Sequence, residues 1–127
     1  MTKYEDFTDK HSHITIEERP MINKGLYSDG CIWINKSLCQ NEKRCILAEE
    51  VGHHETSVGN ILDQKSLLNQ KQEQKARVWA YNELLPESEI IAAASNGFTE
   101  VWEMAEDLEV TEEFLREALE YYGFLNA

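Results

Sequence analysis

Residues 46–54 have the sequence Ile46-Leu47-Ala48-Glu49-Glu50-Val51-Gly52-His53-His54. Apolar side chains recur here at helical spacing, which predicts a helix that begins at Gln40 or Asn41. On such a helix Glu49 and His53 are one turn apart and about 40° apart around the axis, whereas Glu50 is rotated by roughly 100° from Glu49. Two ligand-type side chains so placed can bind one metal ion, and Glu50 is close enough to hold a water molecule as a general base.

The same residues have a plainer interpretation. Two neighbouring glutamates on a helix commonly form a solvated face, and an acid and a histidine four residues apart often bind nothing. Spacing alone therefore leaves both interpretations open. Gly52 has low helix propensity, and its lack of a side chain would let another segment approach the helix closely.

The residues before this helix predict a small antiparallel sheet. Residues 13–17 alternate apolar and polar side chains, which is typical of a strand with one buried face, and Pro20 ends it. Two further β-forming stretches, residues 25–27 and 31–35, flank Asp29-Gly30, a pair that favours a tight hairpin because both residues tolerate positive φ. A short helix is expected near residues 4–10.

The residues after this helix predict further helices and no strands. Residues 56–68 are expected to be a linker, and Pro86 is expected to end the helix that follows it. The predicted helices are residues 70–85, 87–94, 99–108 and 111–121. The fold class is thus α+β, with a domain over residues 1–86 and an acidic helical segment, residues 87–127, packed on it as a single compact unit.

The charge of the chain is concentrated at one end. The 127 residues include 24 acidic and 12 basic side chains, a net charge of −12. Residues 1–86 hold 13 acids against 11 bases, whereas residues 87–127 hold 11 acids against Arg116 alone. Residues 105–119 have the spacing of a helix-turn-helix, but their acidity disfavours duplex DNA and anionic membranes. An acidic surface instead favours a protein partner.

Two further observations concern location. Cys31, Cys39 and Cys45 form an odd set without CxxC spacing, which is typical of a reduced, cytoplasmic protein. The sequence contains no apolar run long enough for a transmembrane helix, and its first residues do not have the pattern of a signal peptide.

Residues 47–56 resemble the metallopeptidase helix of the ImmA/IrrE family, in the branch found in Gram-positive prophages and mobile elements. In that branch Glu often replaces the first His of the HExxH motif, which gives the EExxH variant seen here. Residues 25–35 are similar to the hairpin that precedes this helix in the family. Residues 73–86 are similar to its second helix, where the third zinc ligand corresponds to Glu73. The resemblance is strong over residues 20–86 and weaker elsewhere.

The resemblance implies a small zincin-like fold with Zn²⁺ as cofactor. Glu49, His53 and Glu73 would be the metal ligands, and Glu50 would be the catalytic general base. The implied function is a zinc metalloendopeptidase that cleaves or inactivates a basic helix-turn-helix repressor encoded near it. The alternative is a non-catalytic protein of the same fold that acts as an anti-repressor by binding, and a weaker third hypothesis is a toxin–antitoxin or anti-repressor adaptor.

Several other side chains are weaker candidates. His54 is expected in packing or behind the ligands, Cys45 as a small buried apolar residue, and His11 and His13 as an exposed chance pair. Alternative ligands are Glu83 and Asp63, and alternative oxyanion stabilisers are Tyr27 and Tyr81. The three tryptophans are expected in the core, and residues 31–35 are expected to be an edge strand to which an extended substrate could add.

Overall fold

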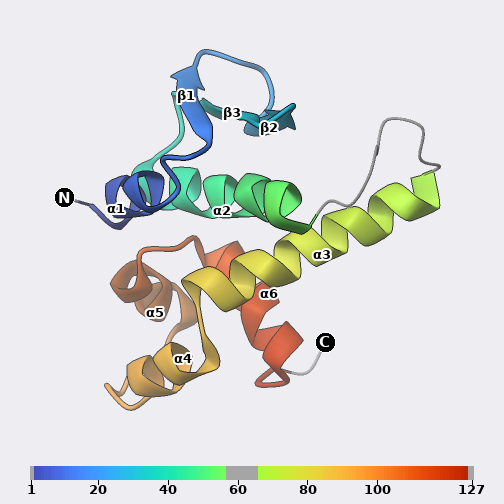
Figure 1. Ribbon diagram of the computed structural model, residues 1–127. Coiled ribbons are helices and arrows are strands. Elements are labelled where there is room, and N and C mark those ends of the chain that lie inside the picture. Colours follow the sequence, from blue (N-terminus) through green and yellow to red (C-terminus); the bar gives the residue numbers. More distant parts are fainter. Residues whose placement is uncertain (1, 57–65, 126–127) are drawn as a thin grey trace.

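The computed structural model describes residues 2–56 and 66–125 (Figure 1). Within these residues the chain is α+β, as the sequence predicts. Its elements are, in chain order, α1 (Lys3–Lys10), β1 (Thr15–Arg19), β2 (Gly25–Ser28), β3 (Cys31–Asn35), α2 (Gln40–Thr56), α3 (Ser66–Leu84), α4 (Glu87–Ala94), α5 (Val101–Leu108) and α6 (Glu112–Tyr122). The sheet lies on one side of α2, α1 lies beside the first turns of α2, and α4 to α6 lie on the other side of the long helix α3 (Figure 1).

The sheet has the strand order β1-β3-β2, which corrects the expected antiparallel arrangement. The hairpin is present: β2 and β3 pair antiparallel, and Asp29 and Gly30 at its turn have φ of 48° and 77°. However, β1 pairs with β3 in parallel, with Thr15 opposite Cys31, so the sheet is mixed. The apolar strand β3 takes the central position because Ile32 and Ile34 are fully buried there.

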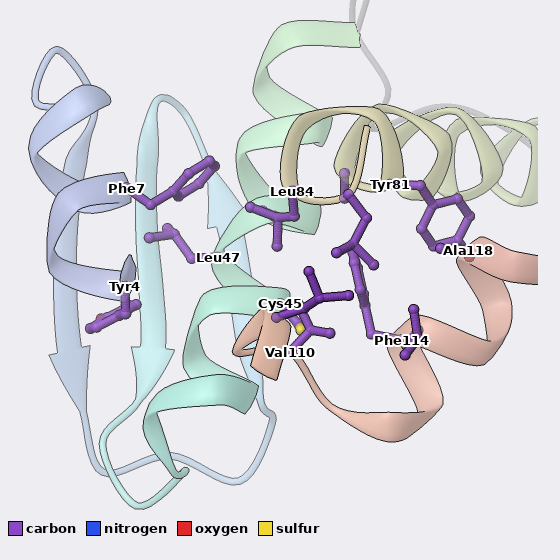
Figure 2. Packing of buried hydrophobic residues seen from close by; sticks show 14 of the residues in the cluster. Tyr4, Phe7, Cys45, Leu47, Tyr81, Leu84, Val110, Phe114 and Ala118 are labelled. Atoms are coloured by element: carbon purple, nitrogen blue, oxygen red, sulfur yellow. The ribbon is translucent and has the colours of Figure 1, made fainter. Parts of the chain in front are cut away.

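Helix α1 is fixed at its start and along one face. Thr2 and Glu5 form a reciprocal capping box, in which each side chain accepts from the other residue's backbone N–H. Tyr4 and Phe7 are buried and gather with Leu47 of α2 (Figure 2). This contact holds the N-terminal segment against α2.

A partly buried ion pair joins α1, β1 and α2. Lys43 Nζ donates to Glu18 Oε1 at 2.8 Å, and the Tyr4 hydroxyl donates to Glu18 Oε2 at 2.8 Å. The Lys43 side chain is only 9% exposed, and Glu18 is the counter-charge paired with it. Burial raises the pKa of Glu18, but the hydrogen bonds from Lys43 and Tyr4 outweigh it and leave the pKa below its ordinary value of 4.5.

We expect Glu18→Gln to lower the free energy of unfolding by about 1–2 kcal/mol near neutral pH, because it removes the counter-charge of Lys43. The expected loss is smaller than for a fully buried pair because Glu18 is 34% exposed. A carboxyl group whose folded-state pKa is lowered stabilises the fold above its unfolded pKa, and this stabilisation is lost as the pH falls through the folded value. Urea unfolding should therefore show that the difference in the free energy of unfolding between wild type and variant becomes smaller below about pH 4. A difference that grows in acid would contradict this.

Helices α2 and α3 meet at their backbones. A Cβ atom added to Gly52 would lie 2.6 Å from the carbonyl oxygen of Ala76 and 3.1 Å from its Cα. The close approach that the sequence suggested for Gly52 is therefore made by α3. The contact sets the distance between the two helices next to His53.

The acidic helices are bound to α2 and α3 by specific contacts. The buried Arg44 donates through Nη1 to the carbonyl oxygens of Leu108 at 2.9 Å and Glu109 at 3.1 Å, where Glu109 ends α5 with φ of 58°. The Thr111 side chain caps α6, as predicted, by accepting from the N–H of Phe114. Cys45, Val110 and Phe114 gather in this part of the core (Figure 2). A division of the chain at residue 86 stays a prediction.

Two sequence expectations are wrong in this half of the molecule. Helix α3 begins at Ser66, four residues before the predicted start at Gln70. The prediction followed the apolar spacing, which becomes helical only from Gln70. Trp102 is 56% exposed and lies outside the core, since Ala105 and Leu108 provide the buried face of the short helix α5. Among the described residues, no helix is long and apolar enough to cross a membrane.

Candidate metal centre

One cavity brings together the four residues that the sequence singled out. Its volume is about 340 Å³, and Glu49, Glu50, His53 and Glu73 all line it. The first three come from α2 and Glu73 from α3. The wall opposite them is strand β2, through Gly25, Leu26 and Tyr27.

The closest pair in the cavity joins the two helices. His53 Nε2 lies 3.2 Å from Glu73 Oε1. The His53 side chain is 13% exposed and that of Glu73 is 52% exposed. Glu73 lies one turn before Ala76, whose backbone contacts Gly52, so the tight helix crossing places these two side chains together.

The two glutamates of α2 are covered and close to other acids. Burial, together with the charges of Glu49 and Glu73, raises the pKa of Glu50 to about 7. The pKa of Glu49 is also raised to about 7, mainly by burial; the charge of Arg77 partly opposes this shift, and those of Glu117 and Glu73 add to it. Both carboxyl groups are thus costly to ionise without a cation.

The donor set fits a divalent metal ion. Three carboxylates and one imidazole line the cavity, and its described lining contains no lysine or arginine to neutralise them. Carboxylate oxygen and imidazole nitrogen are ligands that Zn²⁺ accepts. His53 and Glu73 are already paired, whereas Glu49 also lines a neighbouring cavity, of about 180 Å³, beside Arg77 and Glu117. In the described part of the chain, the three donors whose ligand atoms all lie within 4.8 Å of one another are instead His11, His13 and Glu55.

The weaker candidates lie elsewhere or have other partners. Glu83 pairs with Lys10 at 2.5 Å, away from the cavity. Cys45 is buried beside Thr111, and burial raises the pKa of its thiol to about 12, which agrees with the apolar interpretation. Tyr81 packs edge-on against Phe114, with ring centroids 5.4 Å apart. Asp63 lies outside the described residues.

Sequence reasoning missed a contact that links β2 to α2. The Tyr27 hydroxyl and His54 Nδ1 are 2.9 Å apart, with the rings edge to face. Tyr27 lines the cavity, so His54 supports its wall and is not among the lining residues. No local pattern indicated this pair, because the two residues come from different elements.

The strand beside the cavity also differs from the one expected. Residues 31–35 form the central strand β3 and are paired on both sides, so they are not an edge. The edge strand at the cavity is β2. It passes directly over α2, because a Cβ on Gly25 would lie 2.5 Å from Ile46 Cγ2 and 3.1 Å from Glu50 Oε2.

A small mixed sheet across a helix that carries Glu49, Glu50 and His53, with an acid from the next helix, defines a metallopeptidase-like protein of the zincin type. The model of the Peptidase_M78 family, described as the IrrE N-terminal-like domain, matches residues 2–120. The chain therefore belongs to this family, the ImmA/IrrE family of metallopeptidases. A comparison with curated proteins gave no match.

Proposed function

We infer that the protein is a cytoplasmic, zinc-dependent metalloendopeptidase of a prophage or mobile element that cleaves or inactivates a helix-turn-helix repressor. The observation that carries this proposal is the cavity in which Glu49, Glu50, His53 and Glu73 face the edge strand β2. Family membership supports the metallopeptidase class. The prophage or mobile element, the repressor substrate and the zinc ion go beyond family membership and are proposals.

Each residue of the cavity has a proposed role. Glu49, His53 and Glu73 would hold Zn²⁺, and when bound the ion would supply Lewis-acid activation of a water molecule and of the peptide carbonyl. Glu50 would take the proton of the attacking water and return it to the leaving amine nitrogen. Tyr27 also lines the cavity, and its hydroxyl lies 2.9 Å from His54 Nδ1, which fixes the ring beside the proposed substrate path.

The substrate would bind as an extended segment along β2. An edge strand offers unpaired backbone N–H and C=O groups that a peptide can match, which requires an exposed or locally unfolded stretch of the substrate. Leu26, on this strand, is 42% exposed and lines the cavity, so it offers an apolar contact to a substrate side chain.

The experiment that tests this function uses the repressor encoded beside the gene. Full-length protein loaded with Zn²⁺ is incubated with the purified repressor, and the products are identified by mass spectrometry. We expect one discrete cut in an exposed segment of the repressor. A repressor that stays intact, while a reporter gene is still derepressed in cells, would favour the non-catalytic anti-repressor instead.

The acidic helices are the proposed contact for the basic partner. Between Glu100 and Glu120 there are nine acidic residues and one arginine. We expect the variant Glu106→Lys/Glu120→Lys to slow repressor association by about 10-fold at low salt, because long-range attraction of opposite charges mainly raises the association rate. The association rates of wild type and variant should become equal at high salt, because salt screens the charges.

The matched control reverses two exposed acids on α1, in the variant Asp6→Lys/Asp9→Lys, which changes the net charge equally. Surface plasmon resonance at several salt concentrations measures the association rates. Equal slowing by both variants would show that only net charge matters and that the acidic helices are not the contact.

A further inference from the structure

His11 is a buried histidine without a hydrogen-bond partner. It follows α1 directly and is 7% exposed, with its ring 4.6 Å from that of Phe7 and 6.0 Å from that of Trp79. In the described part of the chain, neither of its ring nitrogens has a partner. Burying an unpaired polar group is costly, so we expect this side chain to bind a ligand from outside the protein.

Two exposed ligand-type side chains lie beside it. His13, just before β1, has Nε2 3.7 Å from Oε1 of Glu55 in the last turn of α2. His11, His13 and Glu55 each offer one ligand atom, and these three atoms all lie within 4.8 Å of one another. The sequence suggested that His11 and His13 form an exposed chance pair, and this is wrong for His11, which is buried because Phe7 and Trp79 pack around it.

We propose that His11, His13 and Glu55 form a second metal site, for a divalent transition-metal ion such as Zn²⁺. Two imidazoles and one carboxylate are a donor set that Zn²⁺ accepts, with water in the fourth position. The donors of a tetrahedral zinc site lie closer together than 4.8 Å, at about 3.4 Å for ligand distances near 2.1 Å. The exposed side chains of His13 and Glu55 can close this gap by rotation, while packing holds His11 in place.

The protonation state of His11 suits this role. A metal binds the neutral imidazole, and a protonated histidine must first lose its proton. Burial lowers the pKa of His11, and although the charge of Glu83 opposes the shift, Lys10 and His13 add to it. His11 is thus neutral and ready to bind at neutral pH.

This site is separate from the cavity of Glu49 and His53. Glu55 follows His53 by two residues, which places it about 200° around the helix from that ligand position. His54 lies between the two sites: its ring centroid is 6.1 Å from that of His13, and its Nδ1 contacts the Tyr27 hydroxyl. An ion here would tie the turn between α1 and β1 to the last turn of α2, the same helix end that carries His53.

The test measures bound Zn²⁺ in the tag-free, full-length protein after equilibration with the metal and gel filtration. We expect about two equivalents in wild type, about one in His53→Ala, about one in His13→Ala and none in the double variant. Because His13 is exposed, its substitution leaves the core intact. In the His53→Ala background, added Zn²⁺ should also raise Tm by about 5 °C, and His13→Ala should abolish that rise.

The matched control is His54→Gln, which removes the neighbouring histidine that is not a proposed ligand and should leave both equivalents bound. If the proposed catalytic site binds no zinc, wild type and His53→Ala will each bind about one equivalent and His13→Ala none, which still supports the second site. Equal zinc content in His13→Ala and wild type, or loss of an equivalent in His54→Gln, would overturn the proposal.

Discussion

The variant Glu50→Gln is expected to cleave the repressor about 10²–10⁴-fold more slowly than wild type, the range that a general base contributes. Glutamine has nearly the same shape as glutamate but cannot accept the proton of the attacking water. Glu50 lines the cavity without being a proposed ligand, so zinc content and repressor affinity should stay close to those of wild type. Single-turnover cleavage followed by gel electrophoresis gives the rate, and binding is measured separately.

The control for this substitution is Asp9→Asn, which makes the same carboxylate-to-amide change on the exposed surface of α1 and should cleave at the wild-type rate. A Glu50→Gln protein that cuts as fast as wild type would remove Glu50 from the mechanism. A Glu50→Gln protein that relieves repression fully without cutting the repressor would instead indicate an anti-repressor that acts by binding.

The parts of the fold that the sequence predicts are those that short-range chemistry determines. The Asp29-Gly30 turn, the cap at Thr111 and the stop at Pro86 each depend on one or two residues and their backbone preferences. The helix that carries Glu49 and His53 follows from apolar spacing within a single segment. These features were therefore predictable without knowledge of the tertiary structure.

The features that the sequence did not predict depend on residues far apart in the chain. One of these features is the strand order. Strand β3 is central and the core buries its Ile32 and Ile34, and no local pattern in β1 or β2 specifies this order. The surroundings of His11 are another, since Trp79 of α3 packs edge-on against it, with ring centroids 6.0 Å apart. The same holds for Glu49, whose charged neighbours Arg77 and Glu117 come from α3 and α6.

Gly52→Val is expected to lower the free energy of unfolding by about 3 kcal/mol or more, the upper end of the range for overpacking. The Cβ atom alone would lie 2.6 Å from a backbone oxygen of α3, and backbone of a packed helix cannot move aside as a flexible side chain does. Valine adds two methyl groups at this point, so α2 and α3 must separate. Urea unfolding monitored by circular dichroism measures the loss.

The same substitution should also cost the protein the zinc that His53 is proposed to bind. His53 follows Gly52, and Glu73 lies one turn from Ala76, so the 3.2 Å contact between the two side chains depends on this crossing. Ala92→Val, on the exposed side of α4, controls for the helix propensity of valine, which costs less than about 1 kcal/mol. If Gly52→Val were as stable as this control and kept its full zinc content, the close crossing would not be what positions His53 against Glu73. The expected loss of both stability and metal follows from one backbone contact, and it ties the packing of α2 on α3 to the chemistry of the cavity.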